Sequence, residues 1–325
     1  MCDSSGVDVA VIGLGLIGGS LLRALAAEGH RVTGFDADPA TRALAGEAGY
    51  RVTGTPHEAA DGAEVVALAV PLPVLPAVLA DLAGHDGLIT DVTSVKGPVR
   101  DLAAKHGLRR FVGGHPMAGK ETSGFAAADP ELFAGCVWVL GLELETALDD
   151  WLTLAALYTA LGARVVPATA AEHDRAVAQV SHVPHLLAAA LARQLAGNPL
   201  AAALAAGSFR DGTRVAATRA ELTAAMCGGN AVEVEHTLHT VLGDLHHLHD
   251  LLETPDPAAA LIPPLAAASD LRRAWPPRPT GQVVEMPAGA EALLALGRSG
   301  GWVTAVAENR TSVSTMRPET DRNRS

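Results

Sequence analysis

A glycine-rich turn near the N-terminus constrains the fold of this chain more than any other feature. The segment GLGLIG at residues 13–18 has the spacing GxGxxG and directly follows a short β-branched apolar run at residues 7–12. An Ala- and Leu-rich helical pattern starts within the turn and ends near Gly29. A strand, a tight glycine turn and a helix in this order are typical of the dinucleotide-binding unit of a parallel α/β sheet.

The same turn predicts the cofactor. Glycines let the backbone approach a pyrophosphate closely, and the helix N-terminus offers free N–H groups and positive potential. Asp36 ends the next apolar run, VTGFD. A carboxylate there suits the two ribose hydroxyls of NAD and repels the additional phosphate of NADP. We therefore predict an NAD site that consists of Gly13, Gly15, Leu16, Ile17, Gly18 and Asp36.

The order of the predicted elements gives the fold class. Apolar β-rich runs alternate with helical stretches up to residue 168, which predicts an α/β fold with a Rossmann-type, doubly wound parallel sheet. From Thr169 to about Leu252 the pattern is helical; Thr169 and Glu172 have capping-box spacing, and Pro184 is expected to kink the first helix. A second helix is expected over 219–252. We assign residues 1–168 to a dinucleotide-binding domain, 169–275 to an all-helical substrate and dimerisation domain, and 276–325 to a linker and short C-terminal extension.

Composition narrows the range of partners and compartments. The chain has 36 acidic and 24 basic residues, and its net charge of −12 disfavours nucleic acid and anionic membranes as partners. Its three cysteines fit neither a zinc site nor a disulfide framework, which favours a reducing compartment. No apolar run is long enough for a membrane span, and no basic segment typical of a signal peptide is present at the start. We expect a cytoplasmic protein.

Two further segments contain candidate catalytic groups. DVTSVKG at 91–97 and GGHPMAG at 113–119 each follow the carboxyl end of a predicted strand, which is the edge where open α/β sheets bind ligands. Glycines and a proline enclose His115, and a neutral imidazole there can take a proton from a substrate hydroxyl. Ser94 can hydrogen-bond the same hydroxyl or orient the imidazole. We predict His115 and Ser94 as catalytic residues.

The helical domain contains candidate substrate-binding residues. Ser181, His182 and His185 lie on the first predicted helix, where Ser181 and His185 share a face. Arg214 follows in the segment GSFRDGTR, and a guanidinium can hold a carboxylate with two parallel hydrogen bonds. Arg210 is the alternative for this role. Several histidines between residues 236 and 249 are spread around one predicted helix, so we expect no metal site.

Taken in order, five segments resemble those of the prephenate/arogenate dehydrogenase family of tyrosine biosynthesis: GLGLIGGS, DVTSVKG, GGHPMAGKETSG, AAEHDRAVAQVSHVPH and FRDGTRVA. The resemblance covers about residues 7–252 and implies a Rossmann domain, a helical domain that forms a homodimer, and an active site between them. It also implies NAD(P)-dependent oxidative decarboxylation of a cyclohexadiene. Thr93 stands where this family usually has glycine.

The resemblance implies a role for each candidate residue. His115 matches the histidine that accepts the proton of the ring C4 hydroxyl, and Ser94 matches the serine that assists it. Arg214 matches the arginine that holds the ring carboxylate. The residues matching Ser181, His182 and His185 line the pocket for cofactor and substrate.

Several functions remain open at this point. Prephenate would give 4-hydroxyphenylpyruvate and CO2, whereas arogenate would give tyrosine directly. The ammonium group of arogenate favours an acidic pocket residue, and the candidate pocket residues are not acidic, so the sequence favours prephenate. An amino-substituted prephenate of secondary metabolism is a further option. A non-catalytic NAD-binding sensor is the alternative from another class, although a sensor needs neither a base nor a carboxylate clamp.

Overall fold

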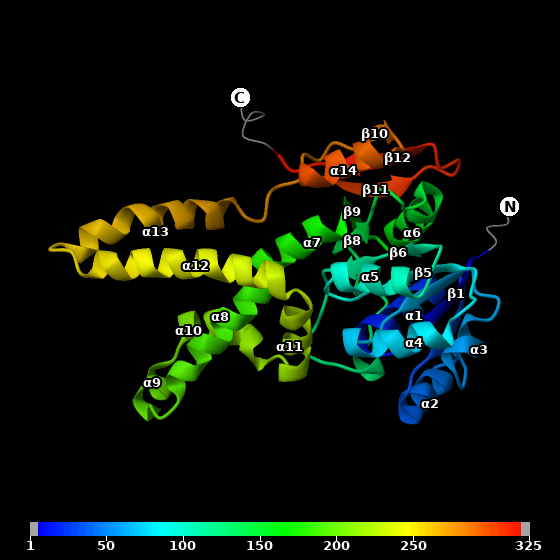
Figure 1. Ribbon diagram of the computed structural model, residues 1–325, viewed down its shortest axis with the longest axis horizontal. Coiled ribbons are helices and arrows are strands. Elements are labelled where there is room, and N and C mark those ends of the chain that lie inside the picture. The colour runs from blue at the N-terminus through cyan, green and yellow to red at the C-terminus, as the bar shows by residue number, and fades with distance from the viewer. Residues whose placement is uncertain (1–5, 320–325) are drawn as a thin grey trace.

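The Rossmann-type sheet predicted for the first part of the chain is confirmed. A computed structural model describes residues 6–319, and its first sheet has six parallel strands in the order β3-β2-β1-β4-β5-β6 (Figure 1). β1 lies in the middle and places the glycine turn at the carboxyl edge of the sheet. The strands are β1 (Asp8–Ile12), β2 (Arg31–Phe35), β3 (Arg51–Val52), β4 (Val65–Leu68), β5 (Leu88–Asp91) and β6 (Phe111–Val112).

Helices cover both faces of this sheet because successive strand side chains point in opposite directions. Val9 and Val11 of β1 pack in one core cluster with α1 and α2, whereas Ala10 and Ile12 pack in another with α3, α4 and α5. Both faces of β1 are therefore apolar, as a buried parallel strand requires. The helices are α1 (Leu16–Ala27), α2 (Pro39–Glu47), α3 (Pro56–Ala60), α4 (Leu75–Asp81) and α5 (Gly97–Lys105).

A second six-stranded sheet, in the order β10-β12-β11-β9-β8-β7, corrects part of the sequence interpretation. The runs at 136–141 and 163–168 were expected to continue the parallel sheet, but they form β8 and β9 of this second sheet. The chain leaves the first sheet after β6, and β7 then pairs antiparallel with β8. The elements are β7 (Gly114–Pro116), β8 (Val137–Gly141), α6 (Leu148–Ala160) and β9 (Arg164–Ala168).

The C-terminal segment completes the second sheet. β11 lies beside β9, and β12 and β10 follow it in antiparallel pairing. α14 packs tightly against β9, since a Cβ on Gly297 would lie 1.9 Å from the carbonyl oxygen of Pro167. The elements are β10 (Val284–Pro287), α14 (Ala290–Arg298), β11 (Trp302–Val306) and β12 (Ser312–Met316).

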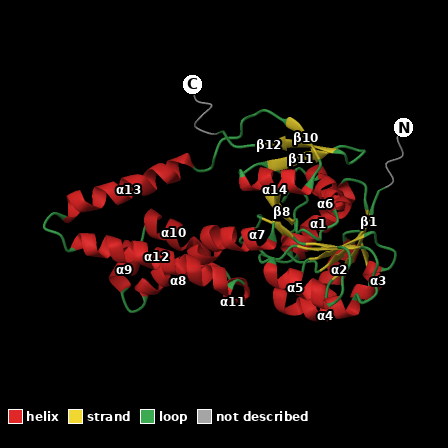
Figure 2. Ribbon diagram, turned by 45° about the horizontal axis from the view of Figure 1, so that its top comes forward, coloured by secondary structure: helices red, strands yellow, loops and turns green. Residues whose placement is uncertain are grey.

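The remaining helices form an arm that extends away from the two sheets (Figures 1 and 2). The predicted capping box is present: Glu172 N donates to Thr169 Oγ1 (3.2 Å) and Thr169 N donates to Glu172 Oε2 (3.0 Å). Within the described residues, no helix is long and apolar enough to cross a membrane. The helices are α7 (Ala170–Val177), α8 (Val183–Ala192), α9 (Pro199–Leu204), α10 (Gly207–Thr213), α11 (Ala220–Gly229), α12 (Ala231–Leu252) and α13 (Pro257–Ala274).

Two details of the arm go beyond the sequence expectation. A π-helical turn, Ala178–His182, separates α7 from α8 directly before Pro184. Proline cannot donate a backbone hydrogen bond to the preceding turn, and the regular α-helical pattern is interrupted at this point of the chain. The helix expected over 219–252 is two helices, α11 and α12, that meet at Asn230. Both breaks lie next to residues of the candidate site.

Candidate active site

The glycine turn has the geometry of a dinucleotide cradle. Gly13 has φ +97°, a conformation that favours glycine, and a Cβ on Gly18 would lie 1.9 Å from the carbonyl oxygen of Gly13. Leu14 N donates to Asp36 Oδ2 at 2.7 Å, which fixes the carboxylate of Asp36 at the end of β2. The predicted acidic residue therefore lies directly beside the turn.

Gly15 differs from the other two glycines of the motif. It has φ −68°, which any residue can adopt, and a Cβ built on it would meet nothing within 4 Å. Packing within the chain therefore does not require glycine at this N-cap position of α1. Open space directly in front of a helix N-terminus is what an approaching pyrophosphate needs, and the turn fits a dinucleotide for this reason.

His115 lies on β7 and is half-buried. β7 packs closely against β5, because a Cβ on Gly114 would lie 2.6 Å from the carbonyl oxygen of Asp91. His115 is opposite Val139 of β8 in the second sheet. The imidazole thus belongs to a strand that is held on both sides, as its glycine- and proline-rich surroundings predict.

A buried ion pair supports this strand. Lys96 and Asp91 are fully buried and bond to each other, and Lys96 Nζ also donates to the carbonyl oxygen of Gly114 at 2.6 Å. Thr93 Oγ1 lies 2.5 Å from Asp91 Oδ2 and 3.2 Å from Lys96 Nζ. Burial lowers the pKa of Lys96, and the charge of Asp91 opposes that change. The segment 91–97 therefore fixes the backbone beside His115.

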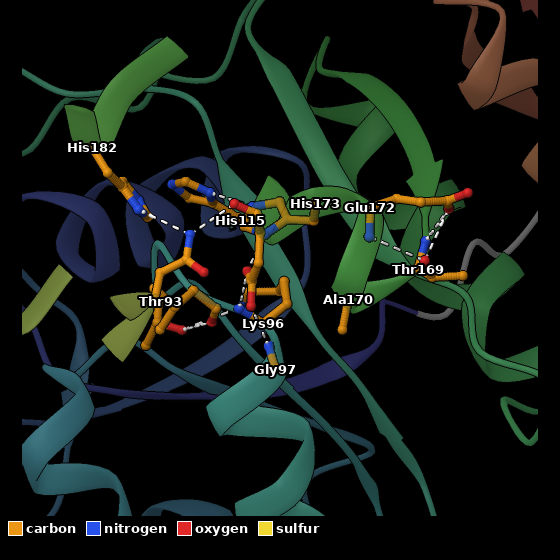
Figure 3. Close-up of polar contacts among 12 residues, drawn as sticks. Thr93, Lys96, Gly97, His115, Thr169, Ala170, Glu172, His173 and His182 are labelled. Carbon is orange, nitrogen blue, oxygen red and sulfur yellow. Dashed lines mark hydrogen bonds and ion pairs between the residues drawn. The ribbon is translucent and has the colours of Figure 1, made fainter. Parts of the chain in front are cut away.

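The partner of His115 is a residue that the sequence analysis missed. His115 Nδ1 lies 2.9 Å from His173 Nε2, and His173 Nδ1 lies 2.7 Å from Asp174 Oδ1 (Figure 3). His173 and Asp174 occupy the inner side of α7 and are buried. An adjacent His-Asp pair shortly after a capping box was visible in the sequence, but its partners are 58 and 78 residues away along the chain.

Asn230 connects this cluster to the next histidine. Its Nδ2 donates to the carbonyl oxygen of Asp174 (2.7 Å) and lies 3.1 Å from His182 Nδ1. His182 ends the π-helical turn and is fully buried, whereas Ser181 beside it is half-buried. The junction of α11 and α12 thus orients His182.

The histidines of the site are neutral near pH 7. Burial lowers the pKa of His115 well below its usual range, and His173, Lys96 and His182 lower it further. Burial also lowers the pKa of His173, although the hydrogen bond between His173 and Asp174 opposes this change. Burial lowers the pKa of His182 to about 4. A neutral imidazole has one nitrogen free to accept a proton, so the site can contain a general base.

The other predicted residues extend from His115 towards α8. His182 is close enough to His115 to lower its pKa. In the same way, His185 lowers the pKa of His182, and Arg214 lowers the pKa of His185. Arg214 begins a short 3-10 turn against α8 and is exposed, and Arg210 on α10 is exposed as well. Ser94 is half-buried in the loop after β5. The direct hydrogen-bond partner of the His115 ring is His173, not Ser94.

Comparison with known proteins identifies the family of this chain. The family model for the prephenate dehydrogenase nucleotide-binding domain matches residues 21–167, and the model for the prephenate dehydrogenase dimerization domain matches residues 169–261. The chain belongs to the prephenate dehydrogenase family. The resemblance stated from the sequence motifs is confirmed.

Two relatives show how much of the chain is shared. The prephenate dehydrogenase of Lactococcus lactis subsp. cremoris is 36% identical over 224 residues, which are 64% of this chain and 60% of that protein. The prephenate dehydrogenase of Bacillus subtilis is 31% identical over 290 residues, 85% of this chain and 78% of that protein. The chain therefore spans less than two thirds of the length of the first relative and more than two thirds of the length of the second.

Solved structures agree with this membership. An arogenate dehydrogenase from Synechocystis is 29% identical with a TM-score of 0.74, and covers 83% of this chain and 100% of its own. A prephenate dehydrogenase from Aquifex aeolicus, solved with hydroxyphenyl propionate and NAD+, is 26% identical with a TM-score of 0.77; 83% of this chain and 99% of that one are covered. The likeness extends over more than four fifths of this chain in both cases.

Proposed function

We propose that this chain is an NAD-dependent prephenate dehydrogenase, which converts prephenate to 4-hydroxyphenylpyruvate and CO2 in tyrosine biosynthesis. The observation that carries the proposal is the neutral imidazole of His115, held at the carboxyl edge of the Rossmann sheet. Of the two ring nitrogens of His115, Nδ1 has a hydrogen-bond partner within residues 6–319, whereas Nε2 has none there and is free to accept a proton. Oxidation of a ring hydroxyl requires a group that removes its proton as hydride leaves.

The glycine turn and Asp36 would hold the cofactor. Backbone N–H groups at the start of α1 face the open space in front of Gly15, where a pyrophosphate fits. Asp36, fixed by Leu14 N, would accept hydrogen bonds from the ribose hydroxyls and would repel the extra phosphate of NADP. NAD, when bound, accepts the hydride that leaves C4 of the substrate ring.

The remaining residues would bind and orient the substrate. His115 takes the proton of the C4 hydroxyl at Nε2, and Ser94 hydrogen-bonds the same hydroxyl. Arg214 holds the ring carboxylate that leaves as CO2, and Ser181, His182 and His185 line the pocket. Removal of the hydroxyl proton contributes most in the transition state, where carbonyl character develops at C4. Loss of CO2 makes the ring aromatic and drives the reaction forward.

Prephenate is the preferred substrate in this proposal. Arogenate differs from it by a side-chain ammonium, which an acidic pocket residue would favour, and the proposed pocket residues contain none. The deciding experiment measures formation of reduced cofactor with prephenate and arogenate, each with NAD and NADP. We expect the highest kcat/KM with prephenate and NAD. A preference for arogenate would reassign the substrate, and cofactor binding without turnover on either substrate would favour a sensor.

We also propose a homodimer formed through the helical domain. The family model that matches residues 169–261 describes a dimerization domain, and large apolar side chains are exposed along α12 and α13. We keep the proposed domain boundaries at residues 168 and 275. Residues 284–316, which follow the second boundary, add strands to the second sheet. Within residues 6–319, Cys136 and Cys227 form no disulfide, which supports the proposed reducing, cytoplasmic location.

A further inference from the structure

Three side chains from two elements form one continuous hydrogen-bonded line behind the proposed base. It runs from His115 on β7 through His173 to Asp174, both on α7, over contacts of 2.9 and 2.7 Å. The two rings meet nearly at right angles, with an interplanar angle of 74°. Figure 3 shows the imidazoles of His115 and His173 directed at each other.

The donors around Asp174 fix its charge state. Its Oδ1 accepts from Lys96 N (2.8 Å) and from His173, and its Oδ2 accepts from Gly97 N (2.8 Å). These hydrogen bonds outweigh burial and hold the pKa of Asp174 below its usual range. Asp174 is therefore an ionised carboxylate with acceptors only, and His173 Nδ1 must donate to it.

The proton positions on both rings follow from this anchor. A neutral imidazole carries one N–H, so when His173 Nδ1 donates to Asp174, His173 Nε2 is an acceptor. His115 Nδ1 must then carry the hydrogen that lies between the two rings. In a neutral His115, the lone pair is on Nε2, which is free to take a proton. The opposite tautomer would place an N–H at Nε2, where it could only donate.

We propose that His173 and Asp174 are positioning residues that fix His115 as its Nδ1–H tautomer and stabilise the positive charge it gains. The role in catalysis rests on the function proposed above; the tautomer does not. The substrate hydroxyl gives its proton to His115 Nε2 while the hydride on the same carbon, C4, goes to NAD. The resulting imidazolium keeps its Nδ1–H bond to His173, and Nε2 later releases the proton to solvent.

The charges around the line support stabilisation by Asp174. Lys96 and Asp91 form a closed pair beside His115, so their charges largely cancel. His182, which approaches from the π-helical turn, is neutral because burial lowers its pKa to about 4. Asp174 is thus the remaining net charge in the cluster, and protonation of His115 neutralises it. A carboxylate connected through an imidazole can act in this way without being protonated itself.

The first test reads the tautomer directly and needs no activity. Long-range ¹H–¹⁵N NMR of the full chain, without cofactor or substrate, distinguishes a protonated Nδ1 from a protonated Nε2; His115→Asn and His173→Gln assign the signals. At pH 7 we expect Nδ1–H on both His115 and His173. His182, which accepts from Asn230, should show Nε2–H and serves as the internal contrast. An Nε2–H tautomer at His115 would overturn the proposal.

The second test separates a positioning role from a structural one. His173→Phe keeps the ring volume but removes the acceptor, and we expect kcat with prephenate to fall about 10²-fold or more while KM changes little. His173→Gln can still accept from His115 Nδ1, so it should recover a substantial part of the loss.

Glu172→Gln is the matched control. Glu172 precedes His173 and hydrogen-bonds Thr169 and Arg298; within residues 6–319, none of its side-chain hydrogen bonds reaches the line from His115 to Asp174. We expect its kcat to stay near the wild-type value. Equal losses in Glu172→Gln and His173→Phe, or an unchanged kcat in His173→Phe, would overturn the positioning role. If wild type does not turn over prephenate, only the proposed function fails, and the NMR result still decides the tautomer.

Discussion

At the scale of single residues, the glycine motif contains positions that exist for two different reasons. Gly13 and Gly18 are required by the fold, because a side chain at either would overlap the backbone. Gly15 has ordinary dihedral angles and open space in front of it. Packing within the chain does not require glycine there, which supports the proposed approach of a ligand to the start of α1.

A pair of substitutions tests this difference. Gly15→Ala should leave the free energy of unfolding within about 1 kcal/mol of wild type but weaken NAD binding at least about tenfold, since the new methyl occupies the pyrophosphate position. Gly18→Ala should lower the thermal midpoint clearly, because its Cβ would lie 1.9 Å from a carbonyl oxygen. Thermal unfolding and calorimetric titration with NAD measure both. Unchanged NAD affinity in Gly15→Ala would contradict the cradle.

His115 and Arg214 should affect different kinetic constants. His115→Asn removes the proposed base, and we expect kcat to fall by about 10²–10⁴ with NAD affinity nearly unchanged. Arg214→Ala removes the proposed carboxylate partner and should mainly raise the KM for prephenate. Steady-state kinetics with Arg210→Ala as the control for a nearby exposed arginine checks both. If Arg210→Ala raises KM and Arg214→Ala does not, Arg210 holds the carboxylate.

At the scale of elements, local signals were predictable and distant pairings were not. The capping box of α7 depends on residues three apart, and the sequence predicted it correctly. An apolar run such as residues 136–141 suits a buried strand of either sheet, so its place in the second sheet depends on partners distant in sequence. His173 was missed for the same reason: its significance comes from His115, 58 residues earlier.

The π-helical turn places His182 in a site that should make the fold sensitive to acid. The folded chain keeps His182 neutral down to a pKa of about 4, whereas an unfolded histidine protonates near pH 6.5. Below pH 6.5 the unfolded state binds the additional proton, so stability falls as pH is lowered towards 4. A difference of this size corresponds to about 3 kcal/mol.

Denaturant unfolding at pH values from 7 to 4.5 measures this effect. His182→Gln keeps an acceptor for Asn230 but does not titrate, so its stability should fall less steeply with acid than that of wild type. His249→Gln removes a histidine whose side chain is 68% exposed on α12, and we expect it to follow wild type. A wild-type slope in His182→Gln would show that His182 is charged or exposed in the folded chain.

At the scale of the whole molecule, the helical arm has too little core of its own. Its buried cluster consists of Ala178, Val183 and Val234, with a few half-buried neighbours such as Leu238 and Val241. The apolar residues of α12 begin at this cluster but continue onto the surface. The exposed apolar side chains of α12 and α13 are Val232, Leu242, Leu245, Leu252, Ile262, Leu265 and Leu271.

An exposed apolar surface of this kind marks an interface, and the proposed homodimer would cover it. Leu245→Asp, at a side chain 47% exposed, should shift the protein from dimer to monomer at micromolar concentration, because the new charge would be buried without a partner. Leu144→Asp is the matched control: Leu144 is fully exposed, but it lies between β8 and α6, away from the arm. Light scattering coupled to size exclusion measures the mass of each. A monomeric wild type, or dissociation by both substitutions, would contradict an interface on the arm, whereas dissociation by Leu245→Asp alone would assign α12 to it.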